Sequence, residues 1–448
     1  MIAPARLAAY DALRAISDTR ADLPHALAHT RDRLPDERDR ALAGEIVTGT
    51  LRWQGAFDYI IRAYTKRTAL DPEVRDVLRL TMFQLLHLDR VPASAAVNDA
   101  VDLTRRAGKR SAAPLVNAVL RRISRERSAL PLPPHPGEPS DREAALAYLS
   151  DTLSHPRWLA SRWLDRYGFD AAAAWEQFDN RAAPLTLRAN RLKTGRDELG
   201  DTLATHGVRT RPARFAPDGL IVESGNPLLL PIAGDGLFVV QDESSQLVPL
   251  FAAVRPGERV LDACASPGGK TTAMAASMDD RGVLIATDVR KRRIGLLART
   301  VRASGARSVR IVQADAALPL PFAASFDCVL VDAPCSGLGT LRRDPDVRWR
   351  RSEEALPAMA DLQLRILEAS AAVVRTGGRI VYSTCSSEPD ENEAVVERFL
   401  AAHPEFTTAP PRDLPELVWP LVSDAGQLRT LPFRDGLEAF FAAMLVKK

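Results

Sequence analysis

The sequence has few cysteines and no long apolar run. Four cysteines occur among its 448 residues, and no two of them have the CxxC spacing of zinc sites, so we expect no metal centre. No stretch of about 18 uncharged apolar residues is present, which argues against a membrane-spanning helix. Arg, Asp and His interrupt the apolar positions near the start of the chain, so no secretory signal peptide is predicted. We therefore expect a cytoplasmic protein with free thiols and no membrane partner.

Lysine is also scarce. Seven of the 60 basic residues are Lys and the rest are Arg, while the formal net charge is only +3. Arginine suits phosphate recognition and stacking on bases, so this bias favours a nucleic-acid partner. A GC-rich genome would produce the same bias without such a partner. Composition alone therefore leaves both explanations open.

Length and patterning predict several domains, because 448 residues exceed one ordinary core. Residues 1–128 have apolar residues at helical spacing and predict an all-α domain. Residues 129–145 are predicted to be a linker, since five prolines fall within 129–140. Residues 146–240 predict a small α/β connecting module. Residues 241–448 alternate strands with helices, which predicts a Rossmann-like, doubly wound and mostly parallel sheet.

Five apolar runs in the last domain indicate buried strands. They cover residues 259–262, 283–288, 309–312, 326–332 and 379–383. In an open α/β sheet, ligands bind at the carboxyl ends of the strands. Cys335 follows the fourth run and Cys385 follows the fifth, so we expect two thiols at that edge.

The first of these strands leads into a glycine-containing turn and a helix start, VLDACASPGGKT over residues 260–271. Glycines let the backbone approach a ligand, and a helix N-terminus favours negative groups. Asp288 ends the second strand and can accept both hydroxyls of a ribose, while Asp315 follows the third strand near an adenine edge. The pattern predicts a cofactor built on adenosine. An NTPase phosphate loop is the weaker interpretation, because Cys264 replaces its first Gly.

The two cysteines suggest covalent chemistry on a pyrimidine. A thiolate that adds to C6 of cytosine turns the ring into an enamine, whose C5 can attack a methyl sulfonium. Loss of the C5 proton and expulsion of the thiolate complete the reaction. A further group must protonate or hydrogen-bond the ring nitrogen N3, and Asp332, at the end of the fourth strand, is the candidate.

Three motifs resemble those of the Sun-type RNA cytosine-C5 methyltransferases: DACASPGGKT, DAPCSGLGTLRRDPDVRW and YSTCSSEPDENE. The resemblance implies that Cys385 is the nucleophile, that Cys335 assists product release, and that S-adenosylmethionine is the cofactor. Asp332 and Lys270 complete the predicted catalytic set. The implied cofactor contacts are Cys264, Ala265, Ser266, Pro267, Gly268, Gly269, Lys270, Asp288, Asp315 and Asp332.

Other interpretations of the cysteines remain open. DNA cytosine methyltransferases use the thiol of a Pro-Cys pair as the nucleophile, so Cys335 is an alternative nucleophile. Free cysteines are often packing residues, and we expect this for Cys328, which lies inside an apolar strand. For Cys264 we expect the backbone, not the sulfur, to contact the cofactor.

The N-terminal part extends the resemblance. FQLLHLDRVPASAAVNDAVDLTRR and LVNAVLRRI are similar to the helical NusB-like domain that precedes the methyltransferase in the bacterial RsmB group. This implies 16S rRNA as the substrate; tRNA, or a non-catalytic RNA-binding factor of the antitermination kind, are the alternatives. LRTLPFRDGLEAFFAAML departs from the usual DGFF of the family, which puts a terminal strand hairpin in doubt. We expect a monomer.

Two arginine clusters are the predicted RNA contacts. One lies at the ends of predicted helices in the N-terminal domain, and the other follows Cys335 closely, beside the expected position of the base. The predicted contacts are Arg105, Arg106, Arg121, Arg122, Arg342, Arg343 and Arg348.

Overall fold

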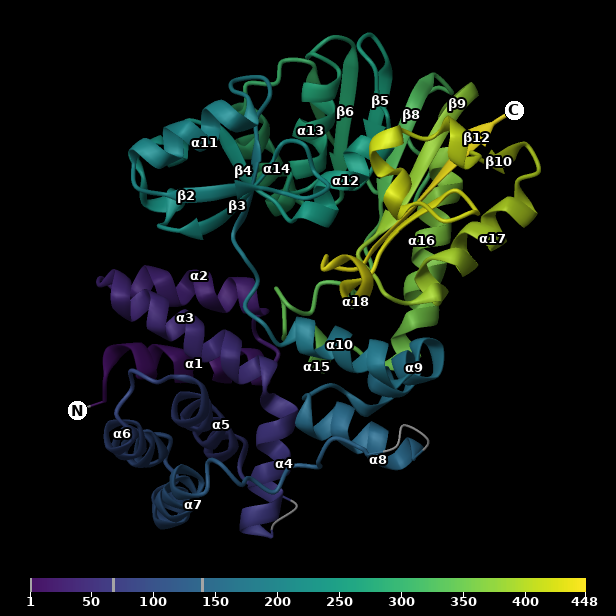
Figure 1. Cartoon of the computed structure of the whole chain (residues 1–448). Helices are drawn as coiled ribbons and strands as arrows, with labels where there is room; N and C mark the ends of the chain where they lie inside the picture. Colours follow the sequence, from purple (N-terminus) through teal and green to yellow (C-terminus); the bar gives the residue numbers. More distant parts are fainter. Residues whose placement is uncertain (1, 67–68, 138–140) are drawn as a thin grey trace. The chain divides into compact units, whose positions relative to one another are not determined.

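The computed structural model describes residues 2–66, 69–137 and 141–448. These residues form two compact units (Figure 1). Unit 1 comprises Met1–Ala182 and Leu341–Glu353, and unit 2 comprises Ala183–Thr340 and Glu354–Lys448. Part of the predicted linker 129–145, residues 138–140, lies outside the described residues.

Unit 1 is helical, as the spacing of its apolar residues predicts. Its α-helices are α1 (Pro4–Ser17), α2 (Leu23–Arg33), α3 (Glu37–Arg52), α4 (Gln54–Thr65), α5 (Pro72–His87), α6 (Ala93–Arg106), α7 (Ala113–Arg125), α8 (Arg142–Ala147), α9 (Arg157–Tyr167), α10 (Phe169–Asp179) and α15 (Val347–Arg350). One hydrophobic core joins α1 to α7. The all-α prediction for the N-terminal domain is confirmed.

Helix α5 shows how local sequence sets these elements. Pro72 stands at its first position, where the missing N–H costs nothing. Asp71 occupies the N-cap position, but its side chain makes no capping hydrogen bond. It forms an ion pair with Lys109 instead, at 3.1 Å. Val77 and Leu78 are fully buried, so packing holds the helix more than its cap does.

Residues 341–353 belong to unit 1, although they follow directly on the loop that carries Cys335. Arg348 is completely buried there, and its guanidinium donates to the backbone carbonyl of Ser154 at 3.0 Å and to Asn180 Oδ1 at 3.1 Å. Trp349 donates its indole N–H to the carbonyl of Leu51 at 2.7 Å. The segment is therefore an internal part of the helical unit.

Unit 2 contains two sheets and the helices that cover them. Its strands are β1 (Thr186–Ala189), β2 (Arg209–Pro212), β3 (Gly219–Ser224), β4 (Phe238–Val240), β5 (Arg259–Asp262), β6 (Val283–Asp288), β7 (Val309–Gln313), β8 (Phe326–Asp332), β9 (Val374–Thr384), β10 (Phe406–Thr408), β11 (Gln427–Thr430) and β12 (Phe440–Lys447). Its α-helices are α11 (Arg196–Thr205), α12 (Glu243–Phe251), α13 (Gly269–Ser277), α14 (Lys291–Ser304), α16 (Leu356–Ala371), α17 (Glu393–Ala402) and α18 (Pro432–Asp435).

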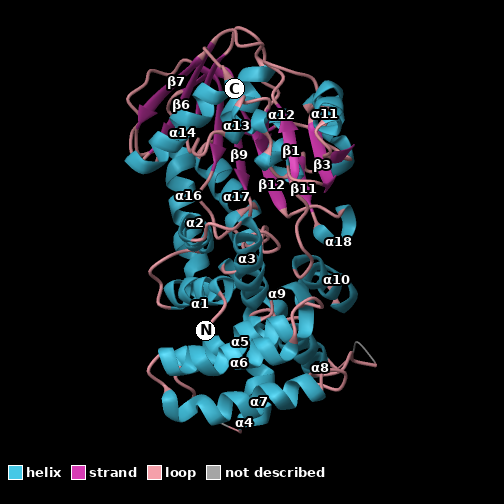
Figure 2. Ribbon diagram, turned by 90° about the vertical axis from the view of Figure 1, so that its left-hand side faces the viewer, coloured by secondary structure: helices cyan, strands magenta, loops and turns pink. Residues whose placement is uncertain are grey.

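The larger sheet has the strand order β10-β12-β9-β8-β5-β6-β7, and β11 also pairs with β12. Strands β5 to β9 pair in parallel, whereas β12 runs antiparallel to β9. Figure 2 draws these strands in magenta among the cyan helices. The predicted Rossmann-like, mostly parallel sheet is confirmed.

Alternate residues of the central strands enter two different cores. Val260 and Cys328 pack with residues of α12, α13 and α14, whereas Leu261 and Val329 pack with residues of α16 and α17. Both faces of the sheet are thus covered. This explains why β5 and β8 are continuous apolar runs rather than alternating ones.

The C-terminal end forms the strand hairpin that the unusual LEA sequence put in doubt. Strands β11 and β12 pair antiparallel, from Gln427 opposite Ala443 to Thr430 opposite Phe440. The carbonyl of Glu438, within the LEA insertion, accepts a hydrogen bond from Thr430 Oγ1 at 2.6 Å. The extra residues are absorbed next to the hairpin without breaking it.

The smaller sheet has the order β2-β3-β1-β4 and is antiparallel throughout. It packs against α11 through a core of its own. The segment predicted as one connecting module, 146–240, is divided: α9 and α10 lie in unit 1, while β1 to β4 lie in unit 2. In unit 1, the buried Trp163 of α9 and Trp175 of α10 stack with ring centroids 4.3 Å apart, so α9 and α10 bury their apolar faces on each other.

Candidate active site

The glycine-containing turn lies between β5 and α13, at the carboxyl edge of the larger sheet. Gly268 precedes the helix with φ of +106°, a left-handed conformation that favours glycine. A Cβ atom at this position would lie 2.9 Å from Leu297 Cδ1. Only glycine therefore lets the turn pass this close to α14.

A cavity of about 420 Å³ opens at this turn. The turn residues of its lining are Cys264, Ala265, Ser266, Pro267, Gly269 and Lys270, and Asp262 and Asp332 also line it. Strand β4 and the residues after it complete the lining with Val239, Val240, Gln241, Asp242 and Ser245, together with Thr300 of α14. This second group was not predicted, because its residues lie outside the motif that carries the recognisable signal: five precede it and Thr300 follows it.

Asp288 and Asp315 lie at the ends of the neighbouring strands, as predicted, but outside this lining. Asp288 is buried and accepts a hydrogen bond from the backbone N–H of Arg290 at 3.0 Å. Asp315 is exposed and accepts one from the N–H of Ala317 at 2.9 Å. Their contact with a ribose and an adenine stays a prediction.

Asp262, the last residue of β5, is a buried carboxyl group with unused hydrogen-bonding capacity. Its Oδ2 accepts a hydrogen bond from Thr271 Oγ1 at 2.7 Å, whereas its Oδ1 has no partner among the described residues. Burial raises the pKa of Asp262 to about 7. A buried polar atom normally has a partner, so this oxygen on the cavity wall is suited to a polar group of a bound ligand.

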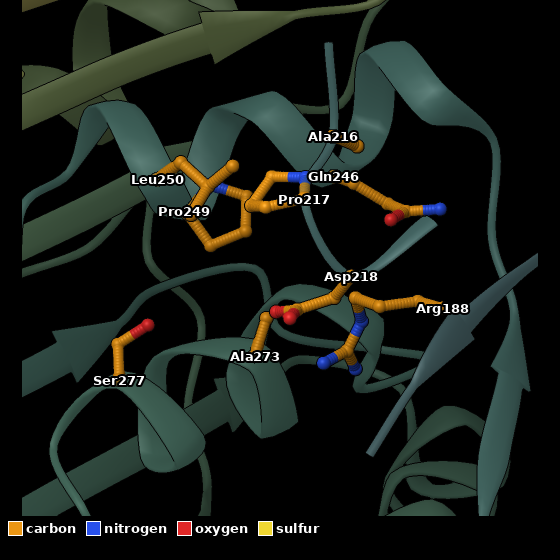
Figure 3. A pocket seen from close by; sticks show the side chains of 9 residues that line it. All are labelled: Arg188, Ala216, Pro217, Asp218, Gln246, Pro249, Leu250, Ala273 and Ser277. Atoms are coloured by element: carbon orange, nitrogen blue, oxygen red, sulfur yellow. The ribbon is translucent and has the colours of Figure 1, made fainter. Parts of the chain in front are cut away.

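Arg188 of β1 forms hydrogen bonds with the first turn of α13. Figure 3 shows this side chain at the edge of a small hollow. Its guanidinium donates to the Gly269 carbonyl at 3.0 Å, to Thr272 Oγ1 at 2.8 Å and to Gln241 Oε1 at 2.7 Å. The side chain is buried, and burial lowers its pKa to about 10. The hollow beside it has a volume of about 10 Å³, room for about one water molecule.

The two predicted cysteines come together. Asp332 at the end of β8 pairs with Ser383 near the end of β9, so the loops that follow start side by side. Cys335 Sγ and Cys385 Sγ lie 3.2 Å apart, and both residues are half-buried. The hydrogen bond with Cys385, together with burial, raises the pKa of the Cys335 thiol well above its ordinary value.

An ion pair lies beside the two thiols. Lys270 Nζ donates to Asp332 Oδ2 at 2.7 Å, and Ser383 Oγ donates to Asp332 Oδ1 at 2.9 Å. Burial alone would lower the pKa of Lys270, but the Asp332 carboxylate outweighs burial and raises it. The predicted catalytic residues thus gather at one edge of the sheet.

Glu391 joins the two cysteine loops, and the sequence analysis did not identify it. It is completely buried. Its Oε1 accepts hydrogen bonds from the Ser336 backbone N–H at 2.8 Å and from Gln363 Nε2 at 2.9 Å. Its Oε2 accepts from Ser386 Oγ at 2.5 Å and from Ser336 Oγ. Since Ser336 follows Cys335 and Ser386 follows Cys385, this carboxylate fixes both cysteine loops at once.

Two further side chains hold this carboxylate in place. Gln363 Nε2 also donates to the Pro334 carbonyl at 3.0 Å. The Tyr382 hydroxyl contacts Gln363 Oε1 at 3.1 Å and donates to the Glu391 carbonyl at 2.5 Å. The network therefore reaches from α16 and β9 to the Pro-Cys pair.

The remaining cysteines lie apart from this chemistry. Cys328 is completely buried in the sheet, and burial raises its pKa to about 11. Its predicted role as a packing residue is confirmed. Cys264 lines the cavity, and burial raises the pKa of its thiol above the ordinary value. A protonated thiol there fits a residue that contacts a ligand mainly through its backbone.

One predicted RNA contact is wrong. Arg348 is completely buried inside unit 1 and is held by backbone carbonyls, so it cannot reach a phosphate. Arg342 is half-buried; it donates to the Ala182 carbonyl at 2.8 Å and lies over the Phe178 ring. Their carbonyl and aromatic partners come from distant parts of the sequence, which a local charge pattern does not reveal.

Comparisons with known proteins identify the family. A family model described as 16S rRNA methyltransferase RsmB/F matches residues 250–446, a NusB family model matches residues 3–125, and a ferredoxin-like domain model of RsmF/B-like methyltransferases matches residues 155–228. The chain is 35% identical to the probable ribosomal RNA small subunit methyltransferase B of Bacillus subtilis over 92% of its length and 91% of that protein.

A second relative agrees. The chain is 33% identical to the ribosomal RNA small subunit methyltransferase B of Pseudomonas putida, over 89% of each chain. It belongs to the RsmB/F family of 16S rRNA methyltransferases. The family uses S-adenosylmethionine, so the predicted cofactor is confirmed.

The fold also has a solved counterpart. The crystal structure of PH0851 matches 100% of this chain and 99% of that chain, with a TM-score of 0.81 and 27% identity. The helical domain, the small sheet and the Rossmann-like sheet thus occur together in a second protein.

No helix in the described part of the chain is long and apolar enough to cross a bilayer. No group of three or more His, Cys, Asp or Glu side chains there has an arrangement that could hold a metal ion.

Proposed function

We propose that this protein transfers a methyl group from S-adenosylmethionine to C5 of a cytosine in 16S rRNA, with Cys385 as the nucleophile. The observation that carries the proposal is the pair of sulfur atoms, 3.2 Å apart, at the ends of adjacent parallel strands. The Lys270–Asp332 ion pair at 2.7 Å lies at the same edge. Family membership supports the rRNA substrate and the methyl donor.

The cavity at the glycine-containing turn fits the methyl donor. Its volume of about 420 Å³ lies within the range of small-molecule sites, and Asp262 Oδ1 offers an unused acceptor on its wall. Bound S-adenosylmethionine supplies an electrophilic methyl group. The residues proposed to hold it are those predicted from the sequence: Cys264, Ala265, Ser266, Pro267, Gly268, Gly269, Lys270, Asp288, Asp315 and Asp332.

Cys385 is the better nucleophile of the two thiols. Its neighbour Cys335 has a pKa well above the ordinary value, so Cys335 keeps its proton at neutral pH and can donate it in a hydrogen bond to Cys385 Sγ. A donated hydrogen bond favours the thiolate form of the acceptor.

The reaction then follows from the positions of these groups. Cys385 Sγ forms a bond to C6 of the base, and the electrons of the C5–C6 double bond move toward N3. The sequence predicted Asp332 for the role at N3, but its two oxygens accept hydrogen bonds from Lys270 and Ser383. We therefore propose that Lys270 supplies a proton or a hydrogen bond at N3 and that Asp332 orients it. After methylation, a solvent water molecule takes the C5 proton and the C5–H electrons re-form the C5–C6 double bond. The bond from C6 to Cys385 breaks, the sulfur leaves as a thiolate, and N3 returns the proton it received. Cys335 assists this last step by hydrogen bonding to the departing sulfur.

The test uses single-turnover methylation of a 16S rRNA transcript. Cys385→Ala should abolish methyl transfer while leaving S-adenosylmethionine binding intact. Full activity of this variant would overturn the assignment of the nucleophile. Cys328→Ala is the matched control, because that thiol lies in the sheet and should leave methyl transfer largely unchanged.

Several finer points belong to the same proposal. Arg105, Arg106, Arg121, Arg122 and Arg343 remain proposed RNA contacts, although Arg105 and Arg122 already form ion pairs with Asp102 and Glu126. Arg342 is a weaker candidate because of its internal contacts. We also propose a monomer acting in the cytoplasm; bisulfite mapping of cellular rRNA and tRNA, with and without the protein, would identify the modified cytosine.

A further inference from the structure

Helix α14 and its flanking residues carry an unusual concentration of positive charge. Residues 289–314 contain eight Arg or Lys and no Asp or Glu. The whole chain has a formal net charge of only +3, so the rest of it is net negative. The eight residues are Arg290, Lys291, Arg292, Arg293, Arg299, Arg302, Arg307 and Arg310, and all are exposed.

Most of these cations are not neutralised by the protein. Arg293 forms an ion pair with Asp288 at 3.7 Å. By contrast, none of Arg290, Lys291, Arg292, Arg299 and Arg302 makes a side-chain hydrogen bond or ion pair with any residue that the structure describes. Codon bias would exchange Lys for Arg, but it would not remove acidic partners from the surroundings. The surface of this helix therefore carries positive charges that could pair with a bound anion.

The helix presents these charges on one side. Its opposite side packs into the core through Leu297, Val301 and Ser304, all buried. At 100° per residue, Arg292, Arg299 and Arg302 fall within about 80° of one another around the axis. A helix packed along its inner face fixes the backbone positions of these three arginines relative to one another. We call these three residues the α14 basic face.

The start of the helix carries charge of the unfavourable sign. The first turn contains no acidic residue, and Lys291, Arg292 and Arg293 occupy its first three positions. The positive end of the helix dipole favours anions and disfavours cations there. These cations lower the stability of the isolated protein, so a bound polyanion would relieve an existing repulsion.

The location suits an RNA substrate. The basic stretch begins two residues after Asp288, which ends β6 at the carboxyl edge of the sheet. The inner side of α14 contacts the cofactor turn, since Leu297 and Thr300 adjoin Gly268. One helix thus borders the cofactor cavity and presents cations outward.

We infer that the α14 basic face binds the phosphate backbone of the RNA substrate. The inference rests on the proposed function for its choice of polyanion. Arginine forms bidentate hydrogen bonds with phosphate oxygens. Contacts of this kind position the RNA without reading its bases, so they would add affinity and leave the choice of cytosine to other residues.

The test measures binding of a 16S rRNA transcript at a series of KCl concentrations. Arg292→Gln, Arg299→Gln and Arg302→Gln are combined in one variant, and Gln keeps the helix propensity. We expect Kd to rise about tenfold or more near 0.15 M salt. The slope of log Kd against log salt should fall by about 2 to 3, because each lost phosphate contact removes about 0.7 to 0.9.

A matched control separates local contacts from net charge. Arg281, Arg398 and Arg412 are exposed and paired with Asp279, Asp361 and Asp413, so their triple replacement by Gln removes the same charge elsewhere in unit 2. It should change the slope by much less than the α14 variant does. Equal loss in both variants, or an unchanged slope in the α14 variant, would overturn the inference.

The same samples distinguish this inference from the proposed chemistry. S-Adenosylmethionine binding, measured by calorimetry, should be unchanged in the α14 variant, which shows that the fold and the cofactor cavity are intact. If the variant loses RNA affinity while the parent protein shows no Cys385-dependent methyl transfer, the basic face stands and the proposed reaction fails. If the parent protein shows Cys385-dependent methyl transfer and the α14 variant keeps its RNA affinity, the proposed reaction stands and the inference about the basic face fails.

Discussion

Buried carboxyl groups are held in opposite ways in the two units. In unit 2, Glu391 accepts four hydrogen bonds, from Ser336, Ser386 and Gln363. In unit 1, both oxygens of Glu176 and both of Asp179 are buried without a hydrogen-bond partner among the described residues. A buried carboxylate with its bonds made can fix a geometry, whereas one without them is a cost to stability.

Glu176 and Asp179 of unit 1 have charged residues nearby, but their carboxyl oxygens make no hydrogen bond with the described residues. His155 lies 3.5 Å from Glu176 and 3.5 Å from Asp179, and all three side chains are fully buried. Burial raises the pKa of Glu176 well above its ordinary value and lowers that of His155 well below it. Arg348 supplies the opposing charge. The difference teaches that burial alone does not show which acidic residue has a positioning role; its hydrogen bonds do.

The largest effect should follow from removing the Glu391 carboxylate. Glu391→Ala leaves the donors of Ser336, Ser386 and Gln363 without their acceptor and lets the cysteine loops move apart. Because a displacement of about 1 Å can cost about 10²-fold in rate, we expect kcat to fall at least about 100-fold. Glu391→Gln keeps an acceptor for the Ser336 N–H and should retain more activity.

The control is Glu397→Gln, an exposed residue of α17, which should leave kcat unchanged. Folding is checked by thermal unfolding and by S-adenosylmethionine binding. If Glu391→Ala binds the methyl donor and methylates RNA at the normal rate, Glu391 has no positioning role.

The next largest effect concerns Arg348 in unit 1. Arg348→Met removes the positive charge beside Asp179 and Glu176 and four hydrogen bonds to unit 1. Breaking a buried charge pair typically costs about 3–5 kcal/mol, so we expect a destabilisation of that order in urea unfolding. Arg122→Gln, at an exposed ion pair, should change the free energy of unfolding by about 0.5 kcal/mol at most. Similar values for the two variants would show that Arg348 is not an internal counter-charge.

A smaller effect appears in the pH dependence of stability. Burial raises the pKa of Asp179 to about 7 in the folded protein, against about 3.9 in the unfolded chain. Between these pH values the folded protein binds more protons, so the Asp179 contribution to stability falls as the pH rises from about 4 to 7. Asp179→Asn should remove that fall. The measurement is the difference in Tm between pH 4.5 and 7.5, compared with the parent protein; an identical difference would contradict the assignment.

The smallest effect should come from Glu176. Burial raises its pKa well above the ordinary value, and its oxygens make no hydrogen bond with the described residues. Glu176→Met replaces it with an apolar side chain of similar size, which is often neutral or stabilising at such sites. We expect a change within about 1 kcal/mol by urea unfolding. Glu391→Met should lower the free energy of unfolding by clearly more. Equal losses for the two variants would show that the carboxyl groups of the two units do not differ in this way.

The parallel strands of the larger sheet could be predicted from local sequence. Val260 and Leu261 are both apolar because each face of β5 is covered, and the run ends at Asp262 where the sheet edge begins. The positions of Cys335 and Cys385 after two such runs then follow from parallel pairing alone. Strand β10 was missed, because its three residues include a single apolar side chain, Phe406, and form no apolar run.

Long-range contacts account for the other differences. Arg348 lies in a run of arginines, which is typical of an exposed surface, yet it is buried because unit 1 receives residues 341–353. Glu391 lies in the acidic sequence EPDENE, which gives no local sign of burial. Its role emerges only when β8, β9 and α16 come together. The cations of α14 are visible in the sequence, but only the structure shows that most of them have no acidic partner among the described residues.

The most direct test of the account is peptide mass spectrometry of the Cys335→Ala variant after incubation with S-adenosylmethionine and a 16S rRNA transcript. A methylated cytosine should stay covalently attached to the peptide containing Cys385, because the residue that assists release is gone. A variant that turns over without any attached nucleotide, or a nucleotide found on Cys335 in the Cys385→Ala protein, would contradict it.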